Sequence, residues 1–185
     1  MATAWLERPL TYDDLRQTPV DGNRYEIIKG ELLVSPLPAT HHQRLVYALS
    51  RMIGDVVDKD RLGRILPGPV DVRLGMHTVV VPDLLFIRAE RLAIDKKTLV
   101  DGPPDLVVEI ASPSTRGRDN VQKAAVYAEA GVPEYWQPDP EQRTFRMQVL
   151  SDGIYHDVAP VDGRFHSTVI PGLVIDPIAL FADLD

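Results

Sequence analysis

Cysteine is absent from the 185 residues of the sequence, so the chain can form no disulfide, no thiolate zinc site and no cysteine nucleophile. No segment approaches the run of about 20 uncharged apolar residues that a membrane-spanning helix needs. The first residues also lack the basic patch and apolar run of a secretory signal. We therefore expect a cytoplasmic protein that does not associate with membranes. A phosphate-binding glycine-rich loop is missing as well.

Basic residues are in the minority: 27 acidic residues stand against 20 basic ones, and the formal net charge is −7. This balance argues against a nucleic acid partner, because phosphate binding requires a basic surface. Net charge is a sum over the whole surface, however, whereas a cleft is local, and metal-dependent enzymes gather carboxylates at their sites. The charge therefore leaves nucleic acid open as a partner. With 44% apolar residues the chain can bury a core, and its length predicts one domain over residues 1–185.

The N-terminal part of the sequence predicts a short helix and then a hairpin. Thr11 and Asp14, three residues apart, resemble the capping pair at a helix start. Two short apolar runs, at 24–28 and 31–34, flank Lys29-Gly30. This arrangement is typical of two antiparallel strands joined by a tight turn.

Helical periodicity predicts two main helices and a short one. Apolar residues recur at spacings of three and four over residues 40–59, with Thr40 as a candidate cap. The second helix covers residues 119–130 and ends at Gly131. A last short helix is expected over residues 178–184.

Strand patterns lie between and after these helices. Residues 79–87 are nearly all apolar, which predicts one strand buried on both faces, with Pro82 where no ladder hydrogen bond is needed. A similar strand is expected over residues 106–111. Further segments complete the pattern: strands at 70–74 and from Tyr135, a turn at 138–141, and a C-terminal β-meander at 145–150, 155–158 and 165–170. The sequence thus predicts an α/β (α+β) domain with a mixed central sheet flanked by helices.

Two carboxylates interrupt the apolar strands. Asp83 lies within the first run and Glu109 within the second. A charge inside a buried strand is costly unless it is paired or bound to a metal, and a strand is a stiff platform for a site. Taken alone, each residue is better explained by a solvated strand end or by an ion pair with an arginine, since structural ion pairs are common. Their occurrence in successive apolar strands favours a shared site.

The helix after Glu109 offers a cation for such a site. Asp119, Lys123 and Tyr127 follow at a spacing of four and share one helix face. Lys123 is either a solvated partner of Asp119 or a cation directed at the Glu109 strand. Two carboxylates and a lysine suffice for metal-dependent phosphodiester hydrolysis: the carboxylates hold Mg²⁺, the metal activates water and the phosphoryl group, and the lysine orients the nucleophile or stabilises the developing charge.

The order Pro82-Asp83, Glu109, lysine resembles the PD-(D/E)xK nuclease superfamily. A finer likeness is to the Uma family of restriction-endonuclease-like proteins and runs from about Thr11 to Asp139. It is carried by Arg24-Tyr25-Glu26, Gly30-Glu31-Leu32, His42-Gln43, Pro82-Asp83-Leu84, Pro104 to Glu109, Ser112 to Thr115, Asp119 with Lys123 and Tyr127, and Gly131 to Trp136.

This resemblance implies a restriction-endonuclease-like core, with the N-terminal hairpin and the C-terminal meander as additions. It implies a DNA endonuclease in which Asp83 and Glu109 bind Mg²⁺ or Mn²⁺ and take part in catalysis. The superfamily places its lysine two residues after the glutamate, where this chain has Ala111. The resemblance assigns that role to Lys123 instead. Glu31 is the candidate for a further metal-binding carboxylate, provided that the hairpin brings it beside Asp83.

Residues for substrate binding are expected on either side of this site. His42 and Gln43 lie in the first turn of the long helix, where an anion is favoured, although an exposed polar turn explains them as well. Arg116 and Arg118 precede the second helix, and they either bind backbone phosphates or belong to a solvated turn. By analogy with enzymes that cut both strands of a duplex, we expect a homodimer.

Two other functions remain open at this stage. One is a catalytically inactive nucleic-acid-binding or scaffold module with the same fold, since fold does not guarantee activity and Ala111 replaces the expected lysine. Alternatively, Asp83 and Glu109 act as acid and base in a metal-free hydrolase, as in glycosidases. That function requires an aromatic-lined groove, and only 6% of the residues are aromatic.

Overall fold

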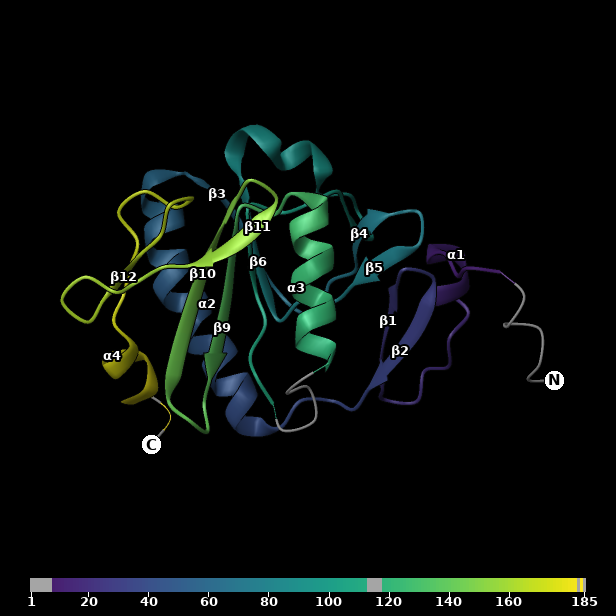
Figure 1. Cartoon of the computed structure of the whole chain (residues 1–185), viewed down its shortest axis with the longest axis horizontal. Helices are drawn as coiled ribbons and strands as arrows, with labels where there is room; N and C mark the ends of the chain where they lie inside the picture. The colour runs from purple at the N-terminus through teal and green to yellow at the C-terminus, as the bar shows by residue number, and fades with distance from the viewer. Residues whose placement is uncertain (1–7, 113–117, 183, 185) are drawn as a thin grey trace.

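The computed structural model describes residues 8–112, 118–182 and 184, and it contains two main sheets with helices packed against them (Figure 1). A five-stranded sheet has the order β2-β1-β5-β4-β7, and a six-stranded sheet has the order β11-β10-β9-β8-β6-β3. In the larger sheet β8 and β9 are parallel and the other neighbours antiparallel, so the predicted mixed sheet is confirmed. No helix among the described residues has the length and apolar character that a membrane crossing requires.

The elements follow one another closely along the chain. The strands are β1 Arg24–Ile28, β2 Glu31–Ser35, β3 Gly63–Pro67, β4 Val72–Gly75, β5 Thr78–Val80, β6 Leu84–Arg88, β7 Val100–Asp101, β8 Leu106–Val108, β9 Glu134–Asp139, β10 Thr144–Ser151, β11 Ile154–Asp157, β12 Phe165–His166 and β13 Val174–Ile175. The helices are α1 Tyr12–Leu15, α2 Thr40–Asp60, α3 Arg118–Ala130 and α4 Pro177–Ala182, with a 3₁₀ helix η1 at Ala89–Ile94.

The N-terminal helix and hairpin form where the sequence predicts them. Helix α1 follows Thr11, whose backbone N–H donates to Asp14 Oδ2 at 2.9 Å. Strands β1 and β2 pair around Lys29 and Gly30, whose φ angles are 51° and 85°. A Cβ at Gly30 would lie 2.6 Å from a proline side chain, so both the backbone conformation and the available space require glycine.

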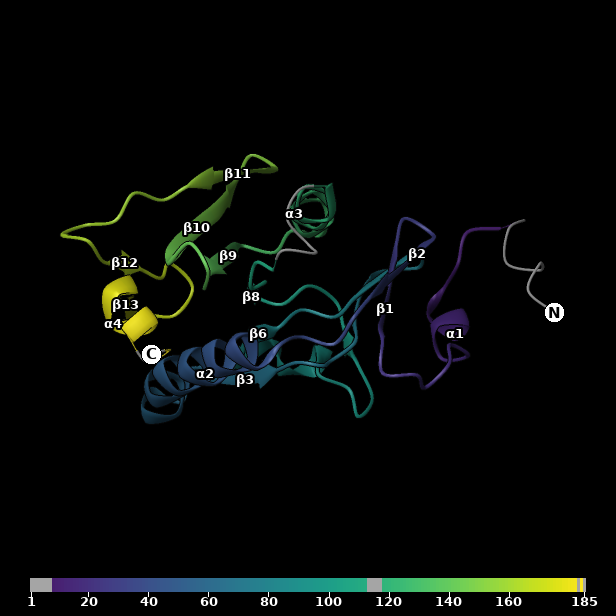
Figure 2. The ribbon, with the colours of Figure 1, turned by 90° about the horizontal axis from the view of Figure 1, so that it is seen from below.

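Alternate residues of the central strands enter two different cores. Leu84 and Phe86 of β6 pack in one core with α2, whereas Leu85 and Ile87 pack in the other with α3 and the five-stranded sheet. Figure 2 shows the two helices on opposite sides of these strands. The central strands are therefore buried on both faces, as their apolar runs predict.

The prediction of a single strand over residues 79–87 is wrong, because the segment forms two strands that belong to two sheets. Strand β5 belongs to the five-stranded sheet and β6 to the six-stranded sheet. Pro82 lies at the break, where its missing N–H interrupts no ladder. Asp83 follows it, donates its backbone N–H to Val108 O at 3.2 Å and accepts from Gly68 N at 2.8 Å. The break places Asp83 where the two sheets meet.

Three local predictions at the element ends also need correction. Thr40 is the first helical residue of α2 and not its cap; the capping position is Ala39, which offers no side-chain bond. Strand β3 lies at Gly63–Pro67, in a segment for which the sequence predicted no strand. Strand β8 stops at Val108, although Glu109 N still donates to Trp136 O at 3.0 Å.

The C-terminal meander is shorter than predicted. In residues 165–170 only Phe165–His166 is a strand, because the Ser167 hydroxyl accepts from the N–H groups of Val169 and Ile170 and turns the chain. Strand β9 runs through Pro138, which was predicted to be in a turn. Its carbonyl accepts from Ala111 N at 2.9 Å.

The α2 core sets the stability of the sheet that carries the site. Leu49 of α2 is fully buried, so Leu49→Ala should lower the free energy of unfolding by about 3 kcal/mol through lost burial and a cavity. Asp55→Ala, at an exposed position of the same helix, should change it by less than about 0.5 kcal/mol. Urea unfolding of both variants measures this, and equal effects would contradict the assignment of the core.

Candidate active site

Asp83 is held at the junction of the two sheets by three donors. Its Oδ1 accepts from Arg24 Nη1 at 2.9 Å, and its Oδ2 lies 3.0 Å from His42 Nε2 and accepts from Ile110 N at 2.8 Å. Burial alone raises the pKa of the Asp83 carboxyl, but the contacts with His42, Arg24 and the Ile110 N–H outweigh it and lower that pKa. Asp83 is therefore an anion at neutral pH.

Glu109 lies directly after β8, beside the peptide that binds Asp83. Lys123 Nζ of α3 donates to its two oxygens at 3.0 and 3.1 Å, and the Tyr127 hydroxyl donates to Oε1 at 2.6 Å. Burial raises the pKa of Glu109 to about 7, although the charge of Lys123 opposes this. The two carboxylates thus differ: Asp83 stays ionised, and Glu109 exchanges its proton near neutral pH.

Lys123 joins Glu109 to a third carboxylate, Glu26 of β1. Its Nζ lies 2.8 Å from Glu26 Oε1, which also accepts from the backbone N of Val81 at 2.7 Å. Burial alone lowers the pKa of Lys123, but Glu109 and Glu26 outweigh it and raise that pKa. The ammonium group is therefore charged, and it is buried between its acidic partners.

These residues form one charge cluster, which consists of Arg24, Glu26, Asp83, Glu109 and Lys123. Its three carboxylates and its lysine are buried, and Arg24 is largely so. The members come from β1, from the break between β5 and β6, from the end of β8 and from α3. The structure thus brings Asp83, Glu109 and Lys123 together, which is the convergence expected from the sequence.

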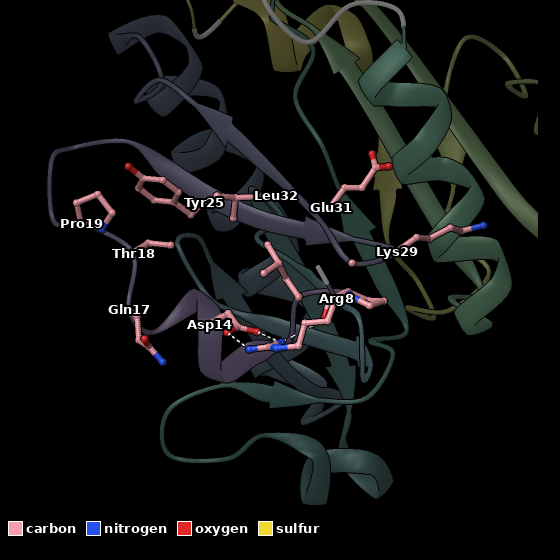
Figure 3. A pocket seen from close by; sticks show the side chains of 12 residues that line it. Arg8, Asp14, Gln17, Thr18, Pro19, Tyr25, Lys29, Glu31 and Leu32 are labelled. Carbon is pink, nitrogen blue, oxygen red and sulfur yellow. Dashed lines mark hydrogen bonds and ion pairs between the residues drawn. The ribbon is translucent and has the colours of Figure 1, made fainter. Parts of the chain in front are cut away.

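Arg24 and Glu26 are the members to which the sequence analysis gave no role in the site, and of the two Glu26 carried the clearer signal. It stands between Tyr25 and Ile27 in a strand whose C-terminal residues are apolar and buried. A carboxylate inside such a strand is the same signal that singled out Asp83 and Glu109. The sequence analysis instead named Glu31 as the metal-binding carboxylate of the hairpin. Glu31 begins β2 and is exposed beside the turn (Figure 3). Among the described residues, Glu31 has no hydrogen bond or ion pair with Asp83 or Glu109.

The other predicted residues have different surroundings. His42 is buried, and its ring contacts Asp83. It therefore orients the Asp83 carboxylate and is not part of an exposed helix turn. Gln43 beside it is exposed. Arg116 lies outside the described residues, and Arg118 is the first residue of α3, with its side chain outside the described part of the structure.

The donor chemistry of the cluster fits a hard divalent cation. Carboxylate oxygens are the ligands that Mg²⁺ takes, and Asp83 and Glu109 provide two such groups on rigid strand ends. Within residues 8–112, 118–182 and 184, no group of three or more metal-ligating side chains is arranged to hold an ion. The carboxylate oxygens are bonded to the N–H and O–H donors of the chain in this arrangement.

Comparison with known proteins identifies the family of the chain. Residues 12–177 match the model of the Uma2 family, whose description is "Putative restriction endonuclease". The chain belongs to this family. The Uma2 match includes every member of the charge cluster, and the resemblance to this family in the sequence is thereby confirmed.

A solved structure shares the fold of this Uma2 chain. It is the crystal structure of "a putative nuclease belonging to DUF820" from Anabaena variabilis ATCC 29413, with a TM-score of 0.78 and 21% sequence identity. The likeness covers 95% of this chain and 99% of that one. The predicted fold class is thus confirmed. No curated protein matches the chain.

The raised pKa of Glu109 predicts a pH-dependent stability. Between its usual pKa of 4.5 and its folded value of about 7, the folded state binds more protons than the unfolded state. This group therefore makes the free energy of unfolding fall as the pH rises through that window, by on the order of 3 kcal/mol. Glu109→Gln should remove the dependence, so the wild-type advantage over this variant should shrink with rising pH in urea unfolding. An advantage that grows with pH would contradict the raised pKa.

Proposed function

We propose that this protein is a Mg²⁺-dependent endonuclease that hydrolyses phosphodiester bonds of DNA. The observation that carries the proposal is the convergence of Asp83, Glu109 and Lys123 in one buried, hydrogen-bonded cluster. Membership of a family described as restriction endonucleases supports the reaction class. Mn²⁺ is the natural substitute for Mg²⁺, because it takes the same oxygen ligands.

Asp83 and Glu109 are the residues that would hold the metal. When bound, Mg²⁺ polarises the phosphoryl group and lowers the pKa of a bound water. Asp83 is suited to this role because its pKa is lowered and it stays anionic. His42 and Arg24 fix the orientation of its carboxylate from opposite oxygens, which is the preorganisation that a metal ligand needs.

Lys123 is the residue that would act on the phosphate. Its ammonium group lies 3.0 Å from Glu109 although it comes from a helix and not from the strand position of Ala111. A fixed cation in a buried site stabilises negative charge that develops on a phosphoryl oxygen. Glu26 holds Lys123 from the other side at 2.8 Å and is a positioning residue.

An inactive binding module is the second candidate, and one observation favours it. The oxygens of Asp83 and Glu109 already accept hydrogen bonds from the chain. A metal ion could bind them only if some of these hydrogen bonds were broken. Calorimetry with Mn²⁺ separates the two candidates: an active enzyme binds the ion, and Asp83→Asn abolishes the binding heat. The absence of binding at millimolar Mn²⁺ would favour the inactive module.

The charge of −7 shapes the expected DNA binding. Few phosphates can be neutralised by such a surface, so affinity for DNA should be weak without the metal and should decrease further as salt is added. A homodimer would supply one site for each strand of a duplex, and sedimentation of the protein with and without DNA tests this part of the proposal.

The carboxylates give the first test of the activity. Nicking of a supercoiled plasmid in Mg²⁺ should fall by at least about a hundredfold in Asp83→Asn and in Glu109→Gln, because each change removes a ligand charge. EDTA should have the same effect. Glu31→Gln, which changes an exposed carboxylate outside the cluster, should retain full activity. Cleavage that survives both cluster variants would refute the assignment.

The helix lysine gives the second test. Lys123→Met keeps most of the side-chain volume and removes the charge, so the single-turnover cleavage rate should fall about a hundredfold. Lys59→Met, at an exposed position near the end of α2, is the matched control. Thermal melting shows whether each variant is folded. A folded Lys123→Met protein with an unchanged rate would show that Lys123 has only a structural role.

A further inference from the structure

A cavity of about 490 Å³ lies beside Asp83 and has no role in the site described so far. Its walls are formed by residues 15–22, the start of β1, the loop between β2 and α2, the first turns of α2 and the Gly68-Pro69 loop. The volume falls in the range of about 300–1,000 Å³ that is typical of small-molecule sites. We refer to it as the Asp83 pocket, with Asn23, Arg24, Leu37, Pro38, Gln43 and Asp83 as its defining residues.

The inner wall of the Asp83 pocket carries a cation with unused bonding capacity. Arg24 uses Nη1 for both Asp83 Oδ1 and the Val81 carbonyl. Its Nε is buried and has no hydrogen-bond partner in the described structure. Buried donors without a partner are rare, and the planar guanidinium group matches a phosphate or carboxylate in geometry. This wall therefore suits an anionic group next to Asp83.

The outer wall of the same pocket has a different chemistry. Leu37 is 68% exposed, and Pro38 lies beside it. Asn23 and Gln43 add exposed amide groups, which both donate and accept. Apolar side chains together with amide groups suit a nucleobase, because its faces are apolar and its edges form hydrogen bonds.

A second and larger cavity, of about 670 Å³, shares Thr18, Pro19 and Tyr25 with the Asp83 pocket (Figure 3). Both of its basic residues are already paired: Arg8 bonds Asp14 at 2.7 Å, and Lys29 bonds Glu129 at 2.7 Å. None of the buried polar atoms that lack a partner in the described structure lines it. This cavity therefore offers no comparable group for a ligand.

We propose that the Asp83 pocket binds a single unpaired nucleotide of the DNA substrate, next to the bond that is cleaved. Arg24 would take the phosphate, and Leu37 and Pro38 would take the base. The inference rests on the proposed function, since it names the substrate class of the same site. A base inside a duplex is stacked and paired and cannot enter such a pocket unless it is extruded. The preferred substrate is therefore DNA with unpaired nucleotides, such as a bulge or a single-stranded end.

The net charge of the chain points in the same direction. A protein with seven surplus negative charges gains little from an extended series of phosphate contacts along a duplex. Binding of one nucleotide in a pocket, by contrast, depends on apolar contact and a few hydrogen bonds. Contacts in the pocket would therefore contribute DNA affinity that an acidic surface does not provide.

Fluorescence anisotropy in EDTA tests the pocket without cleavage. The probes are a fully paired labelled duplex and the same duplex with one extrahelical nucleotide. Wild-type protein should bind the bulged probe at least about tenfold more tightly, as expected from stacking of one base. Leu37→Ala should remove most of this preference, whereas Val34→Ala, 53% exposed on β2 and outside the pocket, should retain it.

Equal affinity of the wild type for both probes would overturn the inference, and so would equal losses in Leu37→Ala and Val34→Ala. Plasmid nicking in Mg²⁺ keeps this outcome separate from the proposed function. A bulge preference without cleavage would support the pocket and refute the nuclease. Cleavage without a bulge preference would support the nuclease and refute the pocket.

Discussion

The ammonium group of Lys123, held between Glu26 and Glu109, is the interaction on which the rest of the structure depends. It lies 2.8 Å from one carboxylate and 3.0 Å from the other, and all three residues are buried. Three buried carboxylates repel one another unless cations lie among them, and an unpaired buried charge costs several kcal/mol. Lys123 therefore joins α3 to both sheets, and the same contact assembles the candidate active site.

The break in the chain at Pro82-Asp83 gives this cluster its geometry. Because β5 and β6 belong to different sheets, Asp83 lies at their junction, where Arg24 reaches it from β1 and the Ile110 N–H reaches it from beyond β8. The peptide that binds Asp83 immediately follows Glu109. The separation of the two carboxylates is consequently set by backbone, which is the rigid support that a metal site requires.

Local patterns were enough to predict much of this arrangement. The hairpin, α2, α3 and the two interrupted strands follow from periodicity and turn residues, and the family resemblance identified Lys123 in place of Ala111. Glu26 was missed because its importance comes from contacts with Val81 and Lys123, which are distant in the sequence. Glu31 was expected beside Asp83, but the hairpin register places it at the turn, where it pairs with Ile28. Glu26 pairs with Leu33 in mid-strand. The division of the apolar run 79–87 into β5 and β6 also depends on which strands pair in each sheet, and the residue pattern of the run does not show this.

We propose that Asp83 and Glu109 together hold a divalent metal ion at this junction. A crystal structure of the protein soaked in Mn²⁺, with anomalous data, would locate the ion. We expect one anomalous peak bonded to a carboxylate oxygen of each residue, with Lys123 still between Glu26 and Glu109 or shifted toward the ion. A fully occupied Mn²⁺ elsewhere on the chain, with the Asp83 and Glu109 oxygens bonded only to their protein donors, would contradict it.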